Sequence, residues 1–195
     1  MRKHLGRNTS GDRLRRPAAK PRLPRRRRIW FEELEFRTLL ATVSWAVDRD
    51  GFWDVAGTWS TGAVPLSGDD VIIDRPGADV TVTLRSGTAT VNVLTSQESL
   101  VVTGGTLSVG RDSTVRDLNI ANGTVTGAGG VAIGETLDWI GGNFTGSGKT
   151  VIAATATFTY AAGTRTTIRG FELTGPASIL SGSLGLDGDG FIREG

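Results

Sequence analysis

An eight-residue pattern that recurs six times between residues 82 and 184 limits the folds open to this chain more than any other feature. Its copies start 18, 18, 19, 21 and 19 residues apart. A unit of this length is too short to bury an apolar face alone, so successive units must stack on one another. The copies read VTLRSGTA from Val82, LVVTGGTL from Leu100, LNIANGTV from Leu118, LDWIGGNF from Leu137, FTYAAGTR from Phe158 and ASILSGSL from Ala177.

Each copy has glycine in its sixth place and a small hydrogen-bonding residue in its seventh. A glycine at a fixed place predicts a corner where the backbone needs a positive φ angle, which other residues adopt only at a cost. Apolar residues alternate before the corner, as in Leu100 and Val102, which predicts a strand with one face inward. The corner glycines are Gly87, Gly105, Gly123, Gly142, Gly163 and Gly182.

The pattern therefore predicts an all-β fold, a single-stranded parallel β-helix (β-solenoid) of about six rungs over residues 80–195. Equivalent residues should form ladders, with Leu100, Leu118 and Leu137 inside and the Thr, Asn and Ser residues at the corner. The unequal spacing argues against hexapeptide repeats and favours a right-handed coil. Arg165 occupies the mostly apolar eighth place, which predicts a bulge in that rung or a wrong register.

The stretch GGNFTGSGKT, residues 141–150, ends like a nucleotide-binding P-loop. That loop needs a glycine five residues before Gly148, with four residues between them; this chain has Asn143 there, and the loop also needs a helix afterwards. The β-branched residues that follow predict a strand instead. We expect Gly142 and Asn143 to form a rung corner and Lys149 to be a solvated turn residue.

Residues 44–79 concentrate aromatic residues among turn-forming residues. Because a stacked solenoid needs a cap at its open end, we expect Trp45, Trp53 and Trp59 to close the coil. The alternative is that these flat rings form a platform for a sugar.

Residues 1–28 carry ten Arg and two Lys against one Asp, so residues 29–195 have a strong acidic excess. With little to bury, this basic leader should be disordered, and its charge supports only sequence-independent binding to nucleic acid. In residues 29–43 the apolar residues recur at roughly helical spacing, with glutamates near the start. These residues predict a short amphipathic helix, which a membrane surface or an export receptor would recognise.

The segment LEFRTLL resembles the LEPR-XLL motif, which follows an Arg-rich leader in very large, repetitive secreted proteins of planctomycete-type bacteria. Phe36 stands where that motif has proline. The resemblance implies a sorting signal, contact between residues 1–43 and export machinery, and an extracellular or cell-surface location. The residues that match are Leu34, Glu35, Arg37, Leu39 and Leu40.

The chain has no cysteine, and its one histidine, His4, lies in the leader, which excludes disulfides and histidine-based catalysis in the body. DRDGFWD from Asp48 and LDGDG ending at Gly190 are fragments of calcium loops without a full ligand set, so we assign no metal and no cofactor, calcium having only this partial support. No catalytic residue is assigned either. One cluster of charges is dense enough for an enzyme site: Asp112, Asp117, Glu135 and Asp138, with Arg111 and Arg116.

The sequence thus favours a non-catalytic, secreted or cell-surface scaffold of structural or adhesive function, the N-terminal part of a larger repetitive protein. Its partners would be cell-surface or matrix components, including glycans. The alternative is a β-helix that binds or cleaves polysaccharide. A flat face lined by Thr, Ser and Asn would favour the scaffold, and a groove lined by Asp, Glu and Arg would favour the alternative.

Overall fold

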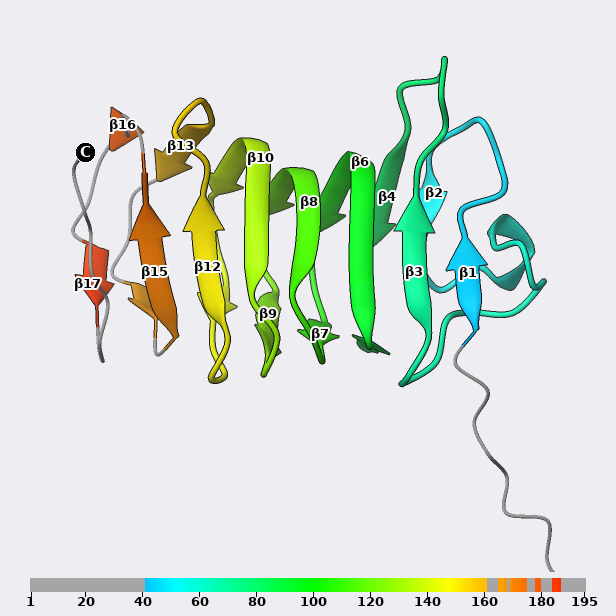
Figure 1. Cartoon of the computed structure of the whole chain (residues 1–195), viewed down its shortest axis with the longest axis horizontal. Coiled ribbons are helices and arrows are strands. Elements are labelled where there is room, and N and C mark those ends of the chain that lie inside the picture. Colours follow the sequence, from blue (N-terminus) through cyan, green and yellow to red (C-terminus); the bar gives the residue numbers. More distant parts are fainter. Residues whose placement is uncertain (1–40, 161–164, 168, 175–177, 180–183, 187–195) are drawn as a thin grey trace, which may run out of the picture. The chain divides into compact units, whose positions relative to one another are not determined.

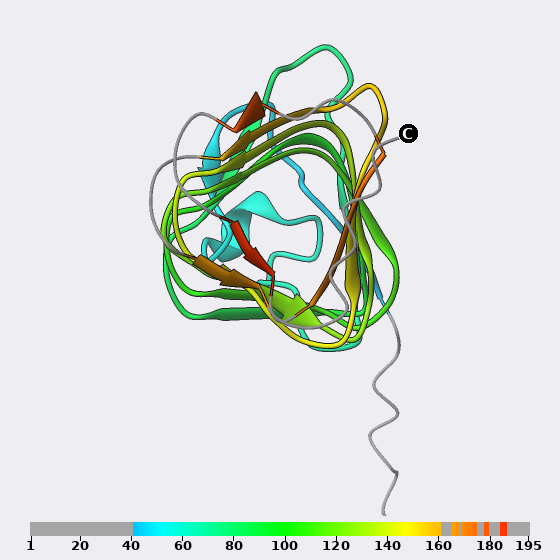
Figure 2. The same cartoon turned by 90° about the vertical axis from the view of Figure 1, so that its left-hand side faces the viewer.

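The computed structural model describes residues 41–160, 165–167, 169–174, 178–179 and 184–186. These residues wind into a β-solenoid in which every pairing between the named strands is parallel (Figure 1). The predicted fold class is therefore confirmed. Seen end-on, the coil has three sides (Figure 2).

We call the three sides faces A, B and C, in the order in which the chain meets them. Faces A and B form one sheet, because β6 (Val93–Val102), β8 (Ser113–Ile120) and β10 (Val131–Trp139) run through the bend between them. Face A also has β1 (Thr42–Ser44), β3 (Asp70–Ile73), β12 (Lys149–Ile152) and β15 (Gly170–Leu173). Face B also has β2 (Gly51–Phe52), β4 (Thr81–Leu84), β13 (Thr157–Tyr160) and β16 (Ser178–Ile179).

Face C is a separate sheet of six strands, and the steps between them make about five turns of the coil. Its strands are β5 (Thr88–Val91), β7 (Thr106–Val109), β9 (Thr124–Gly127), β11 (Asn143–Phe144), β14 (Arg165–Thr167) and β17 (Leu184–Leu186). In Figure 1 the strands of face A lie on the side nearest the viewer and run upward. At the top the chain turns to the far side, and with each turn it advances from right to left, from β3 to β15. The same chain runs anticlockwise toward the viewer in Figure 2, so the coil is right-handed.

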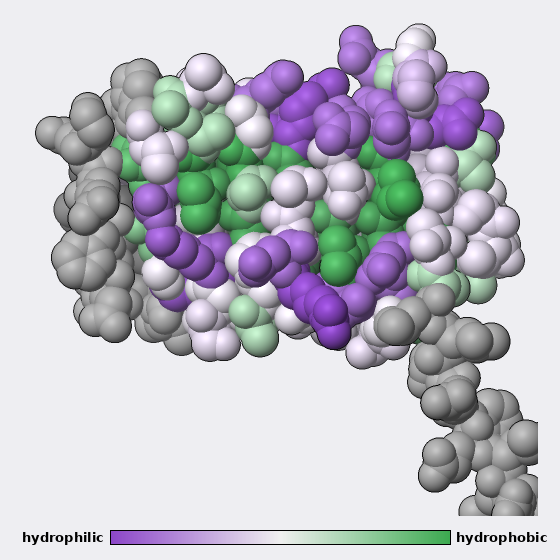
Figure 3. All heavy atoms as spheres, in the orientation of Figure 1, coloured by the Kyte–Doolittle hydropathy of each residue, from purple (hydrophilic) through white to green (hydrophobic). Residues whose placement is uncertain are grey.

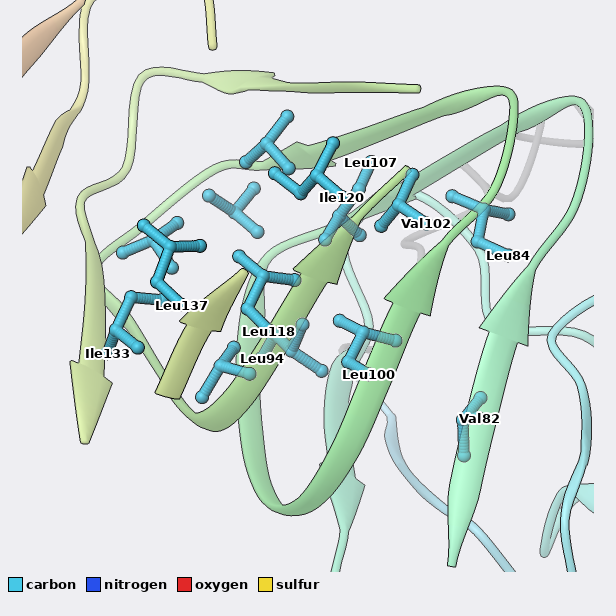
Figure 4. Packing of buried hydrophobic residues seen from close by; sticks show 14 of the residues in the cluster. Val82, Leu84, Leu94, Leu100, Val102, Leu107, Leu118, Ile120, Ile133 and Leu137 are labelled. Carbon is cyan, nitrogen blue, oxygen red and sulfur yellow. The ribbon is translucent and has the colours of Figure 1, made fainter. Parts of the chain in front are cut away.

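The register follows the eight-residue pattern. Val82 pairs with Leu100, Leu100 with Leu118, and Leu118 with Leu137, so the first residues of four copies form one ladder. Leu100, Leu118 and Leu137 are no more than 1% exposed and pack in the interior (Figure 4). Both the ladder and its inward direction were predicted, because a period of two leaves only one face for the apolar residues.

Two expectations need correction. Phe144 pairs with Thr167 and not with Arg165, so the alignment of the copies slips by two residues at β14, as the polar residue in the eighth place suggested. The helix predicted over residues 29–43 does not reach its proposed end, because Thr42 and Val43 belong to β1 and pair with β3. Residues 29–40 lie outside the described residues.

Aromatic side chains fill the interior of the later rungs. Trp139, Phe144, Tyr160, Phe158 and Phe171 are all at most 2% exposed, and their ring centroids lie 4.9 to 6.1 Å apart in mostly edge-to-face contacts. Such contacts stabilise a core by more than the burial of apolar area alone. The ladder thus changes from aliphatic to aromatic while the coil keeps its path.

Candidate functional site

The three tryptophans of residues 44–79 are packed inside the end of the coil. Trp45, Trp53 and Trp59 are 1 to 2% exposed, and Trp59 lies 5.0 and 4.9 Å from the other two ring centroids. The Trp59 indole N–H also donates to the carbonyl oxygen of Trp53 at 2.8 Å. No flat ring face is left for a sugar, so the platform interpretation is wrong, and these residues pack as a cap does.

The acidic residues of the calcium-like stretch hold the next rung instead. Asp48 accepts from the Arg75 guanidinium at 2.6 Å, Asp50 accepts the Thr81 backbone N–H at 2.7 Å, and Asp54 pairs with a third residue, Arg85, at 2.9 Å. Among the described residues no group of three or more candidate ligands is placed to hold a metal ion. Residues 187–190 of the second calcium-like stretch lie outside the described residues.

The corner glycines have two different physical reasons. Gly87, Gly105 and Gly142 have φ of +76°, the left-handed conformation expected at a corner. Gly123 does not have a positive φ; it is required because a Cβ there would overlap the Val102 side chain of the preceding rung. Gly163 and Gly182 lie outside the described residues.

The stretch that resembles a P-loop is a corner followed by a turn. Asn143 begins β11, Gly146 has a φ of +89° in the next turn, and Lys149 begins strand β12 where a P-loop needs a helix. Lys149 is not merely a solvated turn residue, because its ammonium group pairs with Glu172 of the following rung. The stretch therefore has no phosphate-binding geometry.

Face C presents only uncharged hydrogen-bonding groups over its first four rungs. Two outward columns run along the coil, one from Thr88 and the other from Thr90, and the parallel register fixes both. Rungs lie ~4.8 Å apart, and alternate residues of a strand ~6.6 Å apart, so the side chains form a regular grid. The grid consists of Thr88, Thr90, Thr106, Ser108, Thr124, Thr126, Asn143 and Thr145.

A polar groove lies at the bend between faces A and B. One wall is the loop that connects β3 to β4, residues 74–80, which protrudes from the coil at the top of Figure 1. Glu98, only 4% exposed, anchors both ends of this loop: its carboxylate accepts the Arg75 N–H at 2.9 Å and the Val80 N–H at 3.1 Å. Glu98 was not predicted from the sequence, because no periodic position marks it.

The groove encloses about 540 Å³, and hydrophilic residues gather along this upper edge of the coil in Figure 3. Arg116 lies 2.7 Å from Asp117 and 3.8 Å from Glu135. The hydrogen bond to Asp117 raises the pKa of Arg116 further above its already high ordinary value, so this guanidinium stays charged. The lining residues are Asp74, Arg75, Pro76, Gly77, Ala78, Asp79, Gln97, Glu98, Arg116 and Glu135.

A second hollow of about 320 Å³ lies on the outer surface of face B. Ser99, Asp117 and Thr136 line it, and each directly follows a groove residue in the chain: Glu98, Arg116 and Glu135. The two hollows are therefore neighbours along the same bend. Thr81, Leu100, Val101, Leu118, Asn119 and Asp138 complete the lining of the second hollow.

The cluster predicted from the sequence is divided between these places. Arg116, Asp117 and Glu135 lie together at the bend, and Asp138 lines the second hollow. Asp112 instead accepts the Gly130 N–H at 2.8 Å, a contact between rungs away from the groove. Arg111 lines neither hollow.

Arg169 is a second charged residue that the sequence analysis missed. It is 2% exposed and donates to the carbonyl oxygens of Gly129 at 2.8 Å, Gly148 at 3.1 Å and Lys149 at 3.2 Å. Burial lowers the pKa of Arg169 to about 10, because desolvation disfavours the charged form. The hydrogen bonds to three carbonyls offset this cost, and Arg169 thereby links successive rungs between faces C and A.

Comparisons with known proteins give no family for this chain: no family model, no curated protein and no solved structure matches it. Within the described part of the chain, no helix has the length and apolar character needed to cross a membrane. The function must therefore be argued from the coil and its surfaces.

Proposed function

We propose that this β-solenoid is a non-catalytic scaffold of the cell surface or extracellular space that adheres to surface or matrix components, including glycans, through face C. The observation that carries the proposal is the uncharged Thr, Ser and Asn grid over four successive rungs. A repeated hydrogen-bonding surface without charge suits a repeated, uncharged partner, because many weak and identical contacts add up along it.

The adhesive proposal is tested with single substitutions on two faces. Thr106→Lys and Thr124→Lys place charge on face C, and Thr114→Lys places the same charge on face A as a matched control. We expect the first two variants to lose binding of the full chain to isolated cell-envelope and matrix fractions, while the control binds like the parent. Equal binding by all three variants would refute a role for face C.

The location rests on the resemblance of Leu34–Leu40 to a sorting motif, and we propose that residues 1–43 direct export. Because β1 begins at Thr42, a chain that lacks residues 1–40 keeps its first strand and is the better test. Fractionation of cells that express each chain, with N-terminal sequencing of the exported product, should show export of the full chain alone. Export of both chains, or of neither, would contradict the proposal.

A second candidate function is binding or cleavage of a polysaccharide, and the groove at the bend favours it. Charged and amide side chains from four rungs line this groove. Its volume of about 540 Å³ is within the size range of ligand sites. Incubation with a panel of polysaccharides, followed by assays for retention and for new reducing ends, separates binding from cleavage. Neither retention nor new ends would exclude this candidate.

A further inference from the structure

We propose that the groove and the second hollow together bind a glycan that carries protonated amines, such as a polymer of deacetylated hexosamine. This inference rests on the second candidate function, because it names a ligand class for the same groove. It does not depend on face C, so it can fail or succeed independently of the adhesive proposal.

The residues that line the groove leave mainly negative charge available to a ligand. Both guanidinium groups of the groove are already paired, Arg75 with Asp48 and Arg116 with Asp117. The carboxylates of Asp74 and Asp79, both exposed residues, make no hydrogen bond or ion pair with any described residue, and the same holds for the carboxylate of Asp138 in the second hollow. The groups free to bind a ligand are therefore mainly carboxylates, and these attract cations and repel anionic polymers.

Neutral hydrogen-bonding groups lie beside the carboxylates of the groove. Carboxylates of the groove continue into a hollow lined by the side chains of Thr81, Ser99, Asn119 and Thr136, which both donate and accept hydrogen bonds. An amino sugar polymer offers the matching alternation of ammonium and hydroxyl groups along its chain. A basic peptide offers ammonium groups on long apolar stems, and the charged lining of the groove gives those stems little to pack against.

The lining of both hollows also limits which interactions can supply affinity for a glycan. None of the lining residues of either hollow is aromatic, so stacking on a sugar ring does not contribute. Charge-assisted hydrogen bonds between ammonium groups and carboxylates must carry the binding instead, and these are stronger than neutral ones. Since Glu135 and Asp79 are both exposed, their carboxylates can be removed without disturbing the core.

The test measures binding of the full-length chain to short glucosamine oligomers, at a mildly acidic pH, by calorimetry. Oligomers of N-acetylglucosamine of equal length are the neutral control, and oligolysine is the peptide control. We expect the glucosamine oligomer to bind, the neutral oligomer not to bind, and added salt to weaken binding. Asp79→Asn and Glu135→Gln should each raise the dissociation constant about tenfold.

Asp54→Asn is the matched control, since Asp54 is an exposed carboxylate outside both hollows. It should bind the glucosamine oligomer like the parent chain. Equal affinity for oligolysine would overturn the assignment to a glycan, and unchanged affinity in Asp79→Asn and Glu135→Gln would overturn the site. Binding of the neutral oligomer alone would overturn the amine requirement while it supports the second candidate function.

Discussion

Replacement of Glu98 by Gln should release the loop of residues 74–80 from the coil. Each carboxylate oxygen of Glu98 accepts one loop N–H, at 2.9 and 3.1 Å, in a position that is 4% exposed. Glutamine keeps one acceptor and turns an N–H₂ group toward the other donor. A hydrogen bond to a charged group contributes about 1.5–3 kcal/mol, and the lost desolvation cost of the carboxylate returns part of it, so we expect a local destabilisation of about 2 kcal/mol.

Hydrogen exchange followed by mass spectrometry measures this loss where it occurs. About 2 kcal/mol corresponds to roughly thirtyfold faster exchange of the Arg75 and Val80 amides, while amides of β8 and β10 keep their protection. Glu135→Gln is the control, because the Glu135 side chain is 68% exposed and bonds no loop amide. Unchanged exchange in Glu98→Gln would refute the conclusion that Glu98 holds the loop.

Three further substitutions test the interior. Thr150→Val should raise the melting temperature, because it removes a buried hydroxyl without a partner among the described residues and gains about 1 kcal/mol; a lower melting temperature would show that the hydroxyl is satisfied. Leu118→Ala should cost about 3 kcal/mol in urea denaturation, since Leu118 is 1% exposed within the ladder, and a cost below about 1 kcal/mol would place it outside the packed core. Gly142→Ala should cost at least about 1 kcal/mol, because φ is +76° and a Cβ would overlap Gly123 of the preceding rung; thermal denaturation that matches the parent would contradict the corner geometry.

The sequence predicted the coil because the repeat constrains each rung in the same way. Leu100, Leu118 and Leu137 share one place in the pattern, and a ladder is the only arrangement that buries all three with one face inward. The eight-residue pattern covers the strand on face B, the corner and the start of the strand on face C. It therefore identified two of the three strands in a rung. The strand on face A was missed in most rungs, because its inward residues include Ser96, Ser113 and Thr150, which do not produce an apolar alternation.

The candidate site could be predicted only in part. Arg116 and Asp117 are adjacent in the chain, Glu135 follows one rung later, and their charges were recognised as a cluster; the structure brings the three together at the bend. Glu98 and the loop of residues 74–80 lie 18 or more residues apart along the chain at their contacts, and one rung is the separation at which the coil brings residues side by side. Their contact depends on the register between rungs. That register cannot be derived from the sequence until the number of residues in each bend is known.

The bend is also the place where this coil departs from its own repeat. The pairing of β6 and β8 shifts between Ser96 and Ser99, and that of β8 and β10 shifts between Ile133 and Thr136, so neighbouring rungs have unequal numbers of residues there. A regular ladder stacks like residues and offers the same chemistry at every rung, which suits a repetitive surface such as face C. A site for one ligand needs unlike groups at one point, and the shifted pairing at the bend brings such groups together. In this solenoid the regular face and the irregular bend therefore favour different functions, and variants of one should leave the other unchanged.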